Sequence, residues 1–443
     1  MSRVLHRSRA APPMAISAKG LRMRLADGRE ILDGSGGAAV ACIGHGDARV
    51  AEAIAAQAAK LAYAHTSSFT CEAAECLAEH ILDEEPGGLT TAYFCSSGSE
   101  ASEAALKLAR QYFVEIGQPA RDRFIARRQS YHGNTLGALA AGGNMARRAL
   151  YEPVLGGAFS HVSPCFPYHF QENGESEANY LARLITEIDD EFRRLGPERV
   201  IAFIAEPVVG ATAGCVTAIP GYFRAVRSLC DRYGALLIFD EVMCGMGRTG
   251  TQHAWEQEGV APDIQMVAKG LGGGYQPIGG ILIGRKVENA IRAGSGSFMH
   301  GHTYQAHPVA CAGALAVQRI IRGDGLLANV KTMGLRLTQG LQERFGNHAH
   351  VGDIRGRGLF QAIELVADRG RRMPFDPGLK LHERVRLAAL DHGLAVYPMG
   401  GTIDGVRGDH VLISPAYTAT EAEIAEMVER LGAAVDAVLA EIA

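Results

Sequence analysis

Lys269 is the residue of this sequence whose position most clearly suggests chemistry. It follows the apolar segment Gln265 to Ala268, and no other lysine lies between Lys107 and Lys286. Burying a lone ammonium is costly and shifts the side chain towards the neutral amine. A neutral amine at the end of a sheet strand can form a Schiff base with an aldehyde, although a lysine there can also keep its charged head in water. Other motifs in the sequence are needed to distinguish a Schiff-base lysine from a solvated one.

Two carboxylates end apolar segments in the same way. Asp240 closes Leu236 to Asp240, and Glu206 follows Val200 to Ala205. Ligands of open α/β sheets bind beyond the carboxyl ends of the strands, so we expect both acids to share one edge with Lys269. A carboxylate at that edge can keep a pyridine nitrogen protonated, and it can equally cap a helix or bind a metal ion.

A short polar segment between an expected strand and an expected helix suits an anion. Free backbone N–H groups and the positive end of a helix dipole favour a phosphate there, and the same residues also suit an ordinary helix N-cap. A later turn supplies a tyrosine ring that can stack on a flat cofactor. The residues concerned are Ser97, Gly98 and Ser99 in the first segment and Tyr131, His132 and Gly133 in the turn.

The composition is that of a globular chain with small-molecule partners. Its 443 residues carry a formal net charge of −4, which leaves no basic surface for nucleic acid or an anionic membrane. No apolar run reaches the roughly 18 to 20 residues of a transmembrane helix, and the basic start lacks the apolar core of an export signal, so we expect the cytoplasm. The nine cysteines form no C-x-x-C pair, and we expect reduced thiols instead of disulfides or a metal site.

Short apolar runs alternate with amphipathic helical stretches through the middle of the chain. This pattern is typical of a mainly parallel α/β sheet covered by helices. Residues from Pro164 onward are expected to form a long loop, and residues 1 to about 18 a loose arm. The expected strands are Thr91 to Cys95, Arg123 to Ala126, Val200 to Ala205, Leu236 to Asp240, Gln265 to Ala268 and Gly280 to Ile283, and the expected helices include Ser99 to Phe113 and Tyr222 to Tyr233.

The alternation ends after a helix that begins near His307-Pro308, and a smaller α/β domain is expected to follow. Its expected strands are Gly358 to Leu365, Leu394 to Pro398 and Val411 to Ser414, joined by the N-terminal segments Leu21 to Leu25 and Glu30 to Asp33. We therefore predict that residues 1–60 are the N-terminal part of the small domain, 61–308 the large domain and 309–443 the C-terminal part of the small domain.

Taken in order, these motifs resemble the class III aminotransferases, which are fold type I enzymes that depend on pyridoxal 5'-phosphate. The resemblance covers Gly34 to Pro415, and it implies a mainly parallel, seven-stranded sheet in a large cofactor-binding domain plus a smaller α/β domain from both termini. It rests on Gly44-His45-Gly46, Ser97-Gly98-Ser99-Glu100-Ala101, Tyr131-His132-Gly133, Glu206-Pro207, Asp240-Glu241-Val242, the Lys269 segment, and Gly301-His302-Thr303-Tyr304 with His307-Pro308.

The resemblance also implies roles for individual residues. Lys269 would form the Schiff base and move protons, Asp240 would partner the pyridine nitrogen, and Glu206 would be a second catalytic acid. Thr303 would reach the cofactor phosphate of the neighbouring subunit, which implies a homodimer with shared sites. The other cofactor contacts would be Val242 and Tyr131 on opposite faces of the ring, Ser97, Gly98 and Ser99 at the phosphate, and His132 and Gly133 beside them.

The implied reaction is a ping-pong transfer of an amino group from an amine or ω-amino acid to a 2-oxo acid, either pyruvate or 2-oxoglutarate. A decarboxylase, an aminomutase or a racemase on the same scaffold is the alternative. A transaminase consumes an acceptor in stoichiometric amount, whereas a racemase or mutase needs none. The sequence does not name the donor, its stereochemistry, or the choice between dimer and tetramer.

Two substrate contacts are expected from the same resemblance. Relatives often carry a carboxylate-binding arginine a few residues before a Gly-Asp-His stretch, and here the candidate, Arg407, directly precedes Gly408. A solvated loop arginine is the alternative for this position. Ala39, beside Ala38, stands where some amine-active relatives have a bulky aromatic residue, which predicts a roomier donor pocket.

Two further patterns suggest other chemistry. Gly245 to Gly250 matches G-x-G-x-x-G after a strand, which is the outline of a dinucleotide site and would indicate an NAD-dependent dehydrogenase. Asp240 and Glu241 would repel a pyrophosphate at that place. His300 and His302 could bind a metal ion, but no nearby acid or cysteine completes a ligand set.

Overall fold

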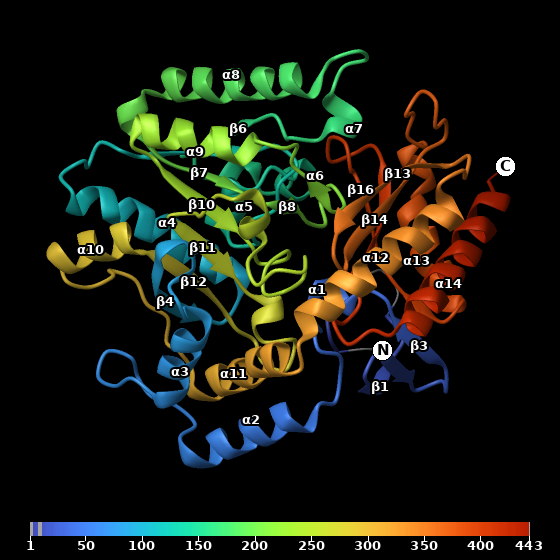
Figure 1. Ribbon diagram of the computed structural model, residues 1–443, viewed down its shortest axis with the longest axis horizontal. Helices are drawn as coiled ribbons and strands as arrows, with labels where there is room; N and C mark the ends of the chain where they lie inside the picture. The colour runs from blue at the N-terminus through green and yellow to red at the C-terminus, as the bar shows by residue number, and fades with distance from the viewer. Residues whose placement is uncertain (1–2, 8–10, 443) are drawn as a thin grey trace.

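A seven-stranded sheet forms the centre of the molecule (Figure 1). The computed structural model describes residues 3–7 and 11–442. β12 runs antiparallel to both of its neighbours, and every other neighbouring pair is parallel, so the expected mainly parallel sheet is confirmed. In spatial order the strands are β4 (Leu89–Cys95), β12 (Gly279–Gly284), β11 (Ile264–Val267), β10 (Leu236–Asp240), β7 (Val200–Ala205), β5 (Arg123–Arg127) and β6 (Phe159–Val162).

β6 is the strand of this sheet that the sequence did not predict. It lies at the edge, where β5 is its one neighbour in the sheet. Its residues Phe159 to His161 are half-buried, and only Val162 is fully buried. An edge strand needs no continuous apolar run, so the pattern that marked the central strands is missing here.

Helices cover both faces of this sheet, which explains the unbroken apolar runs of its central strands. Leu236 and Ile238 of β10 belong to the apolar cluster built with α4 (Gly98–Glu115). The alternate residues Leu237 and Phe239 belong to the cluster on the other face. The helices in that second cluster are α3 (Glu72–Ile81), α8 (Glu177–Leu195), α9 (Tyr222–Tyr233) and α11 (Pro308–Gly323), while α10 (Arg285–Ala293) lies on the α4 side.

Segments from both termini build a second body around two four-stranded sheets. Its helices α12 (Leu326–Phe345), α13 (Leu381–Asp391) and α14 (Glu421–Ala440) contribute to one apolar cluster. The N-terminal strands join the C-terminal ones as the sequence predicted, while the domain boundaries at residues 60 and 308 stay a prediction. One sheet contains β13 (Val351–Arg357), β14 (Phe360–Leu365), β17 (Asp409–Ile413) and β16 (Tyr397–Gly400), and the other contains β1 (Ala15–Lys19), β2 (Arg22–Leu25), β3 (Glu30–Asp33) and β15 (Leu394–Ala395).

Three local expectations were wrong. Leu394 to Pro398 is two strands, because the chain crosses from one sheet to the other: β15 pairs with β3, and β16 pairs with β17. The loop expected after Pro164 contains a helical turn, α7 (Pro167–Phe170), whose first residue is a proline with φ already suited to a helix. The expected loose arm ends earlier than residue 18, because β1 pairs with β2; residues 1, 2 and 8–10 of that arm lie outside the described residues.

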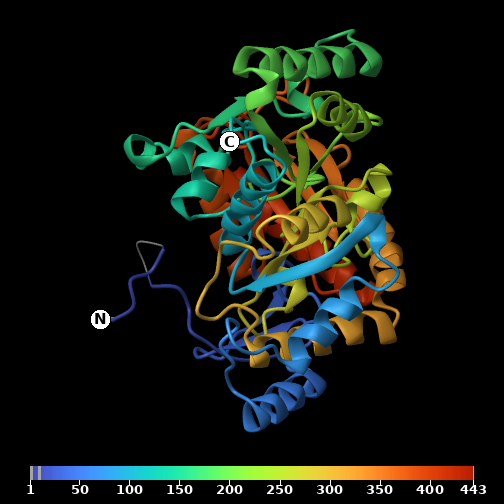
Figure 2. The ribbon, with the colours of Figure 1, turned by 90° about the vertical axis from the view of Figure 1, so that its left-hand side faces the viewer.

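Apart from helix α2 (Ala48–Lys60), the remaining elements are short connections. In Figure 2, α8 lies at one end of the molecule and α2 at the opposite end. No helix within the described residues is long and apolar enough to cross a membrane. The short elements are α1 (Gly36–Ala39), α5 (Leu136–Ala141), α6 (Met145–Arg148), β8 (Val208–Val209), β9 (Val216–Thr217) and the 3-10 turns η1 (Pro86–Gly88), η2 (Glu152–Val154), η3 (Pro197–Arg199), η4 (Ala254–Glu258), η5 (Lys269–Leu271) and η6 (Pro377–Leu379).

Candidate active site

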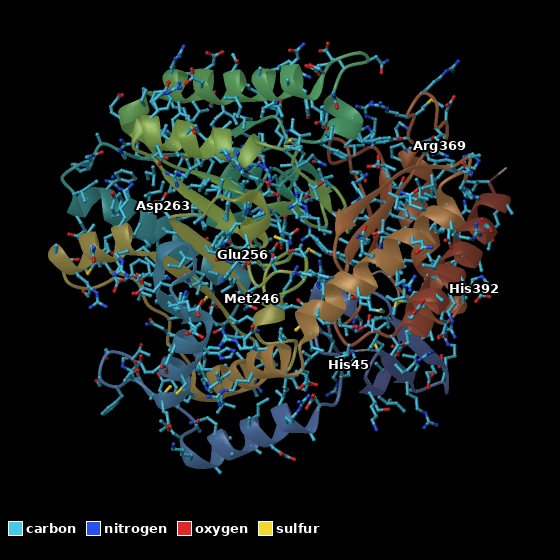
Figure 3. All side chains as sticks on the ribbon, viewed as in Figure 1. His45, Met246, Glu256, Asp263, Arg369 and His392 are labelled. Atoms are coloured by element: carbon cyan, nitrogen blue, oxygen red, sulfur yellow. The ribbon has the colours of Figure 1, made fainter. Side chains whose placement is uncertain are left out.

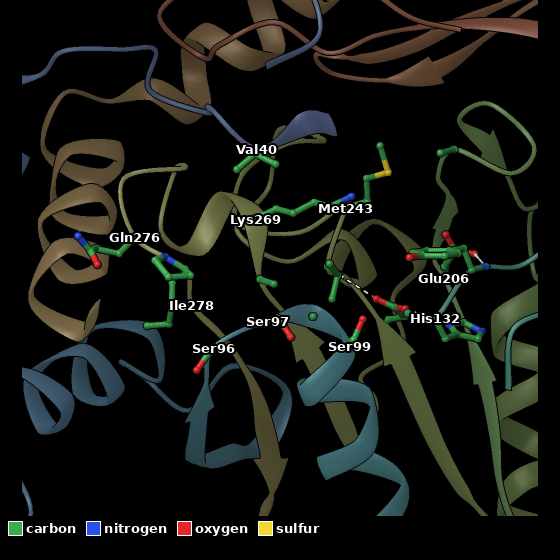
Figure 4. A pocket seen from close by; sticks show the side chains of 18 residues that line it. Val40, Ser96, Ser97, Ser99, His132, Glu206, Met243, Lys269, Gln276 and Ile278 are labelled. Atoms are coloured by element: carbon green, nitrogen blue, oxygen red, sulfur yellow. Dashed lines mark hydrogen bonds and ion pairs between the residues drawn. The ribbon is translucent and has the colours of Figure 1, made fainter. Parts of the chain in front are cut away.

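A cavity of about 280 Å³ opens at the carboxyl edge of the seven-stranded sheet (Figure 4). Asp240 ends β10, Lys269 follows β11 and Glu206 follows β7, and these three strands are parallel neighbours. The structure therefore brings the three groups together at one edge, as the sequence predicted. The expected residues that line the cavity are Ser97, Gly98, Ser99, Tyr131, His132, Gly133, Glu206, Asp240, Val242 and Lys269.

The Lys269 side chain projects into this cavity from a strained turn (Figure 4). Its φ of 44° is in the left-handed region, which costs energy for a residue with a Cβ atom. Gln318 of α11 supports the turn, because its Nε2 donates to the carbonyls of Gly270 and Leu271, each at 2.9 Å. Burial lowers the pKa of the Lys269 amine to about 8, against the attraction of Asp240 and Glu206. An amine with this pKa can both hold and release a proton near neutral pH.

Two hydrogen bonds orient the carboxylate of Asp240. Its Oδ2 lies 2.9 Å from Nδ1 of His132, and its Oδ1 accepts from the backbone N–H of Val242 at 3.0 Å. Both Asp240 and His132 are buried. An ionised Asp240 is an acceptor only, so the proton of the imidazole must lie on Nδ1. The imidazole and the Val242 amide therefore fix the direction in which the carboxylate meets the cavity.

Glu206 supports the wall that carries the tyrosine. Its Oε1 accepts from the backbone N–H of Tyr131 at 3.1 Å, and its Oε2 accepts from the backbone N–H of Gly210 at 2.9 Å. The side chain is buried, and burial raises the pKa of its carboxyl. These contacts give Glu206 a positioning role for Tyr131 in addition to any role as an acid.

The start of α4 forms the opposite wall. Ser97 is its N-cap, with Oγ accepting from the backbone N–H of Glu100 at 3.2 Å, and Ser99 Oγ accepts from the backbone N–H of Asn134 at 2.9 Å. The helix-cap interpretation of this segment is therefore correct, and it does not exclude an anion. The first N–H groups of a helix have no acceptor within the helix, so Gly98 and Ser99 can offer theirs to a phosphate.

The residues of the cavity fit pyridoxal phosphate. A titratable amine, a carboxylate backed by an imidazole, an aromatic ring and a helix start all line one space. The start of α4 also requires glycine at position 98, because a Cβ at Gly98 would lie 2.9 Å from Cγ1 of Val242. Lys269 would hold the aldehyde, Asp240 the pyridine nitrogen and the start of α4 the phosphate.

Three expected residues lie outside the lining of the cavity. Thr303 is exposed, and its carbonyl accepts from Tyr63 Oη at 2.9 Å. Arg407 has a side chain 58% exposed, with Nε 2.7 Å from Oδ2 of Asp404. Ala39 has a φ of 61° and is buried in a cluster with Val208 and Phe360. Its neighbour Val40 lines the cavity instead.

The apolar part of the lining was not predicted from the sequence motifs. Met243 follows the Asp240-Glu241-Val242 motif by one residue, so its position was a usable signal. Val40, Ala211 and Ile278 belong to no polar motif, and nothing in their residue type separates them from core residues. The lining residues that were not predicted are Val40, Ser96, Ala211, Met243, Ala268, Gln276, Pro277 and Ile278.

The glycine-rich segment after β10 serves the packing of the two bodies. Arg248 is buried, and its Nη1 donates to the carbonyls of Leu359 and Pro415. Met246, labelled near the middle of Figure 3, accepts a hydrogen bond on its carbonyl from Tyr417 Oη at 2.9 Å. The side chain of Arg248 lies 4.6 Å from the centre of the Tyr417 ring. The backbone and side chains of residues 245–250 therefore contact other parts of the protein at the place where a dinucleotide would have to bind.

The histidine pair does not complete a metal site. The rings of His300 and His302 lie 4.7 Å apart at right angles. Across residues 3–7 and 11–442, no group of three or more His, Cys, Asp and Glu side chains is arranged to hold a metal ion.

Comparisons with known proteins agree with this geometry. Residues 6–435 match the family model described as aminotransferase class-III. The chain is 49% identical to an uncharacterized aminotransferase of Schizosaccharomyces pombe, over 97% of this chain and 94% of that protein. It is 34% identical to the diaminobutyrate–2-oxoglutarate transaminase of Halomonas elongata, over 97% and 91%. An amine transaminase from an uncultivated Pseudomonas species, solved in its PLP-bound form, superimposes with a TM-score of 0.91 at 35% identity and covers 99% of each chain.

Proposed function

The chain belongs to the class III aminotransferases, which depend on pyridoxal phosphate, and from that premise we propose that it transfers an amino group from an amine or an ω-amino acid to pyruvate or 2-oxoglutarate in two half-reactions. The observation that supports this most is the shared cavity of Lys269 and Asp240. An amine of pKa about 8 and an oriented carboxylate are the two groups that such a transfer needs from the protein.

Pyridoxal phosphate supplies an electron sink for negative charge that develops on the donor carbon. Lys269 would take a proton from that carbon and deliver it to the former aldehyde carbon of the cofactor, since its amine is available in both protonation states near neutral pH. Asp240 would hold the proton on the pyridine nitrogen, and His132 fixes the orientation of the Asp240 carboxylate. Tyr131 and Val242 would contact the two faces of the ring, and Glu206 accepts a hydrogen bond from the backbone of Tyr131.

The donor side of the cavity is apolar. Val40, Met243 and Ile278 line it without offering a charge. Such a wall excludes water from the reacting carbon and favours a donor with an apolar substituent next to its amine. Ala39 does not widen this pocket directly, because its side chain is in the protein core.

We also propose a homodimer that shares its sites, located in the cytoplasm. Thr303 supports the dimer: it is exposed in one chain and lies outside the lining of that chain's own cavity. The nine cysteines support a reducing compartment, since every one is a free thiol. Sedimentation analysis tests the dimer, and a mixed dimer of Thr303→Ala and Lys269→Ala chains tests whether a site is shared.

The absorbance spectrum tests the reaction. The protein loaded with pyridoxal phosphate should show a band near roughly 410 to 430 nm, which reactive amines should move to about 330 nm without any acceptor. A 2-oxo acid should restore the first band, with one ketone or aldehyde formed per amino acid. A racemase or mutase would turn over without the acceptor, and a decarboxylase would release carbon dioxide, so either result would replace the aminotransferase proposal.

A further inference from the structure

A 2-oxo acid brings a carboxylate into the cavity, and a buried carboxylate needs a cation. Lys269 is already committed to the transfer, and Arg248 is enclosed between Leu359, Pro415 and the ring of Tyr417. Arg407 is exposed and held by Asp404. None of these three cations is free to bind that carboxylate.

Arg147 is a further cation, and it lies beside a residue of the cavity wall. It lies on α6, and its guanidinium carbon is 4.9 Å from the centre of the ring of Tyr131, which lines the cavity. The side chain is half-buried. Among the described residues, no carboxylate oxygen lies within 4.0 Å of the guanidinium nitrogens of Arg147, which is the distance limit for an ion pair. In this part of the chain Arg147 donates a hydrogen bond only from its backbone N–H, to Asn144.

The next residue shows what a structural arginine does in the same helix. Arg148 donates from Nη1 to the carbonyls of Ala140 and Gly142, at 2.6 and 2.8 Å, and pairs with Glu152 at 3.2 Å. The guanidinium of Arg148 is therefore bound to partners within the fold. The guanidinium of Arg147 lies over the Tyr131 ring instead, although the two side chains start one residue apart.

The backbone of α6 holds Arg147 at this position. Asn144 caps the helix, with Oδ1 accepting from the backbone N–H of Arg147 at 3.2 Å. The loop that carries Arg407 packs tightly on the same helix, because a Cβ at Gly405 would lie 3.1 Å from Cβ of Met145. The two arginines therefore belong to adjoining segments near the cavity, and the one beside Tyr131 is the one without an anion.

We propose that Arg147 binds the carboxylate of the 2-oxo acid acceptor and thereby selects carboxylate-bearing acceptors, an inference that rests on the proposed function. The planar guanidinium matches a carboxylate with two parallel hydrogen bonds. Its contact with the Tyr131 ring keeps the charge beside the cavity when no acceptor is present. Arg407 keeps its pair with Asp404 and does not take part.

The first test measures binding without turnover. Propanoate, which has the carboxylate but no keto group, is titrated by calorimetry into the cofactor-loaded wild type and into Arg147→Met, Arg147→Lys and Arg407→Met. We expect the dissociation constant to rise at least about tenfold in Arg147→Met, less in Arg147→Lys, and to stay unchanged in Arg407→Met. Absence of propanoate binding by the wild type, or an equal loss in Arg407→Met, overturns the proposal.

The second test separates acceptors by charge. The cofactor is first converted by an amine, and the rate of its return is then followed with pyruvate and with butanal, which has no carboxylate. Arg147→Met should slow the reaction with pyruvate by roughly tenfold to a hundredfold and leave butanal within about twofold. Equal slowing of both acceptors overturns the selective role, since it would show a general disturbance of Tyr131.

One further variant and one contingency complete the tests. Arg7 also acts electrostatically on Tyr131, from an exposed position, so Arg7→Met is measured in parallel, and a loss specific to pyruvate in that variant would assign the carboxylate to Arg7. If the wild type converts no amine at all, the proposed function fails. The propanoate titration still decides the role of Arg147 in that case.

Discussion

Nδ1 of His132 lies 2.9 Å from Oδ2 of Asp240, and both side chains are buried at the floor of the cavity. The pair links a residue of the turn after β5 to the last residue of β10. The chemistry proposed for Asp240 therefore depends on a second segment of the chain, because the imidazole decides where the carboxylate points.

Asp240→Asn should lower the rate of the amine half-reaction by about 10²- to 10⁴-fold, since a neutral amide does not keep the pyridine nitrogen protonated. Stopped-flow absorbance of the cofactor-loaded protein checks this. His132→Gln, which retains a hydrogen-bonding side chain, should lose less. A near-normal rate in Asp240→Asn would show that another group holds the ring nitrogen.

Lys269→Ala should abolish turnover and remove the visible band of the lysine-bound cofactor, while the protein still binds the cofactor noncovalently. The reason is that the amine that makes the covalent link also moves the proton. Lys286→Ala, which replaces an exposed lysine, is the control and should keep both band and activity. Turnover by Lys269→Ala above the level of free cofactor would contradict the mechanism.

The lowered pKa of Lys269 predicts how stability depends on pH in the protein without cofactor. The unfolded chain holds this proton up to the ordinary lysine pKa of 10.5, whereas the folded chain releases it at about 8. Between these values the unfolded state binds more protons, so the free energy of unfolding rises with pH. Relative to Lys269→Met, the wild type should gain up to about 3 kcal/mol from pH 7.5 to 10.5. Urea unfolding of both proteins at each pH measures this, and parallel curves would mean that the amine is not desolvated.

Tyr417→Phe should reduce the free energy of unfolding by about 1 to 2 kcal/mol, because it leaves the buried carbonyl of Met246 without its donor. Tyr168→Phe is the matched control, since the Tyr168 hydroxyl has no hydrogen-bond partner among the described residues. Urea midpoints of the two variants provide the comparison. Equal midpoints would show that the Tyr417 bond contributes nothing.

The polar part of the site was predictable from the sequence because each group ends an apolar strand. Asp240 and Glu206 follow runs that are buried on both faces, and the parallel order of β7, β10 and β11 then brings them to the same edge as Lys269. The spatial order of the strands in the sheet could not be predicted from the sequence. The edge strand β6 was missed because three of its four residues are half-exposed.

The substrate side was less predictable, since it depends on local backbone geometry. Gly37 and Ala39 have φ values of 71° and 61°, and the resulting kink turns Ala39 into the core and leaves Val40 at the cavity. Arg407 directly precedes the Gly-Asp-His stretch, where relatives often have the arginine a few residues earlier, and its guanidinium pairs with Asp404. Arg147 belonged to no motif, and only the contact with Tyr131 singles it out.

The turn that carries Lys269 is contacted by residues of both bodies. Gln318 of α11 holds the carbonyl of Gly270, and Tyr417, from the body built by the two termini, lies so close that a Cβ at Gly270 would be 3.3 Å from its hydroxyl. The Lys269 amine is thus carried by a turn that lies where the two bodies meet. A displacement of one body relative to the other would therefore also displace the turn that carries the Lys269 amine.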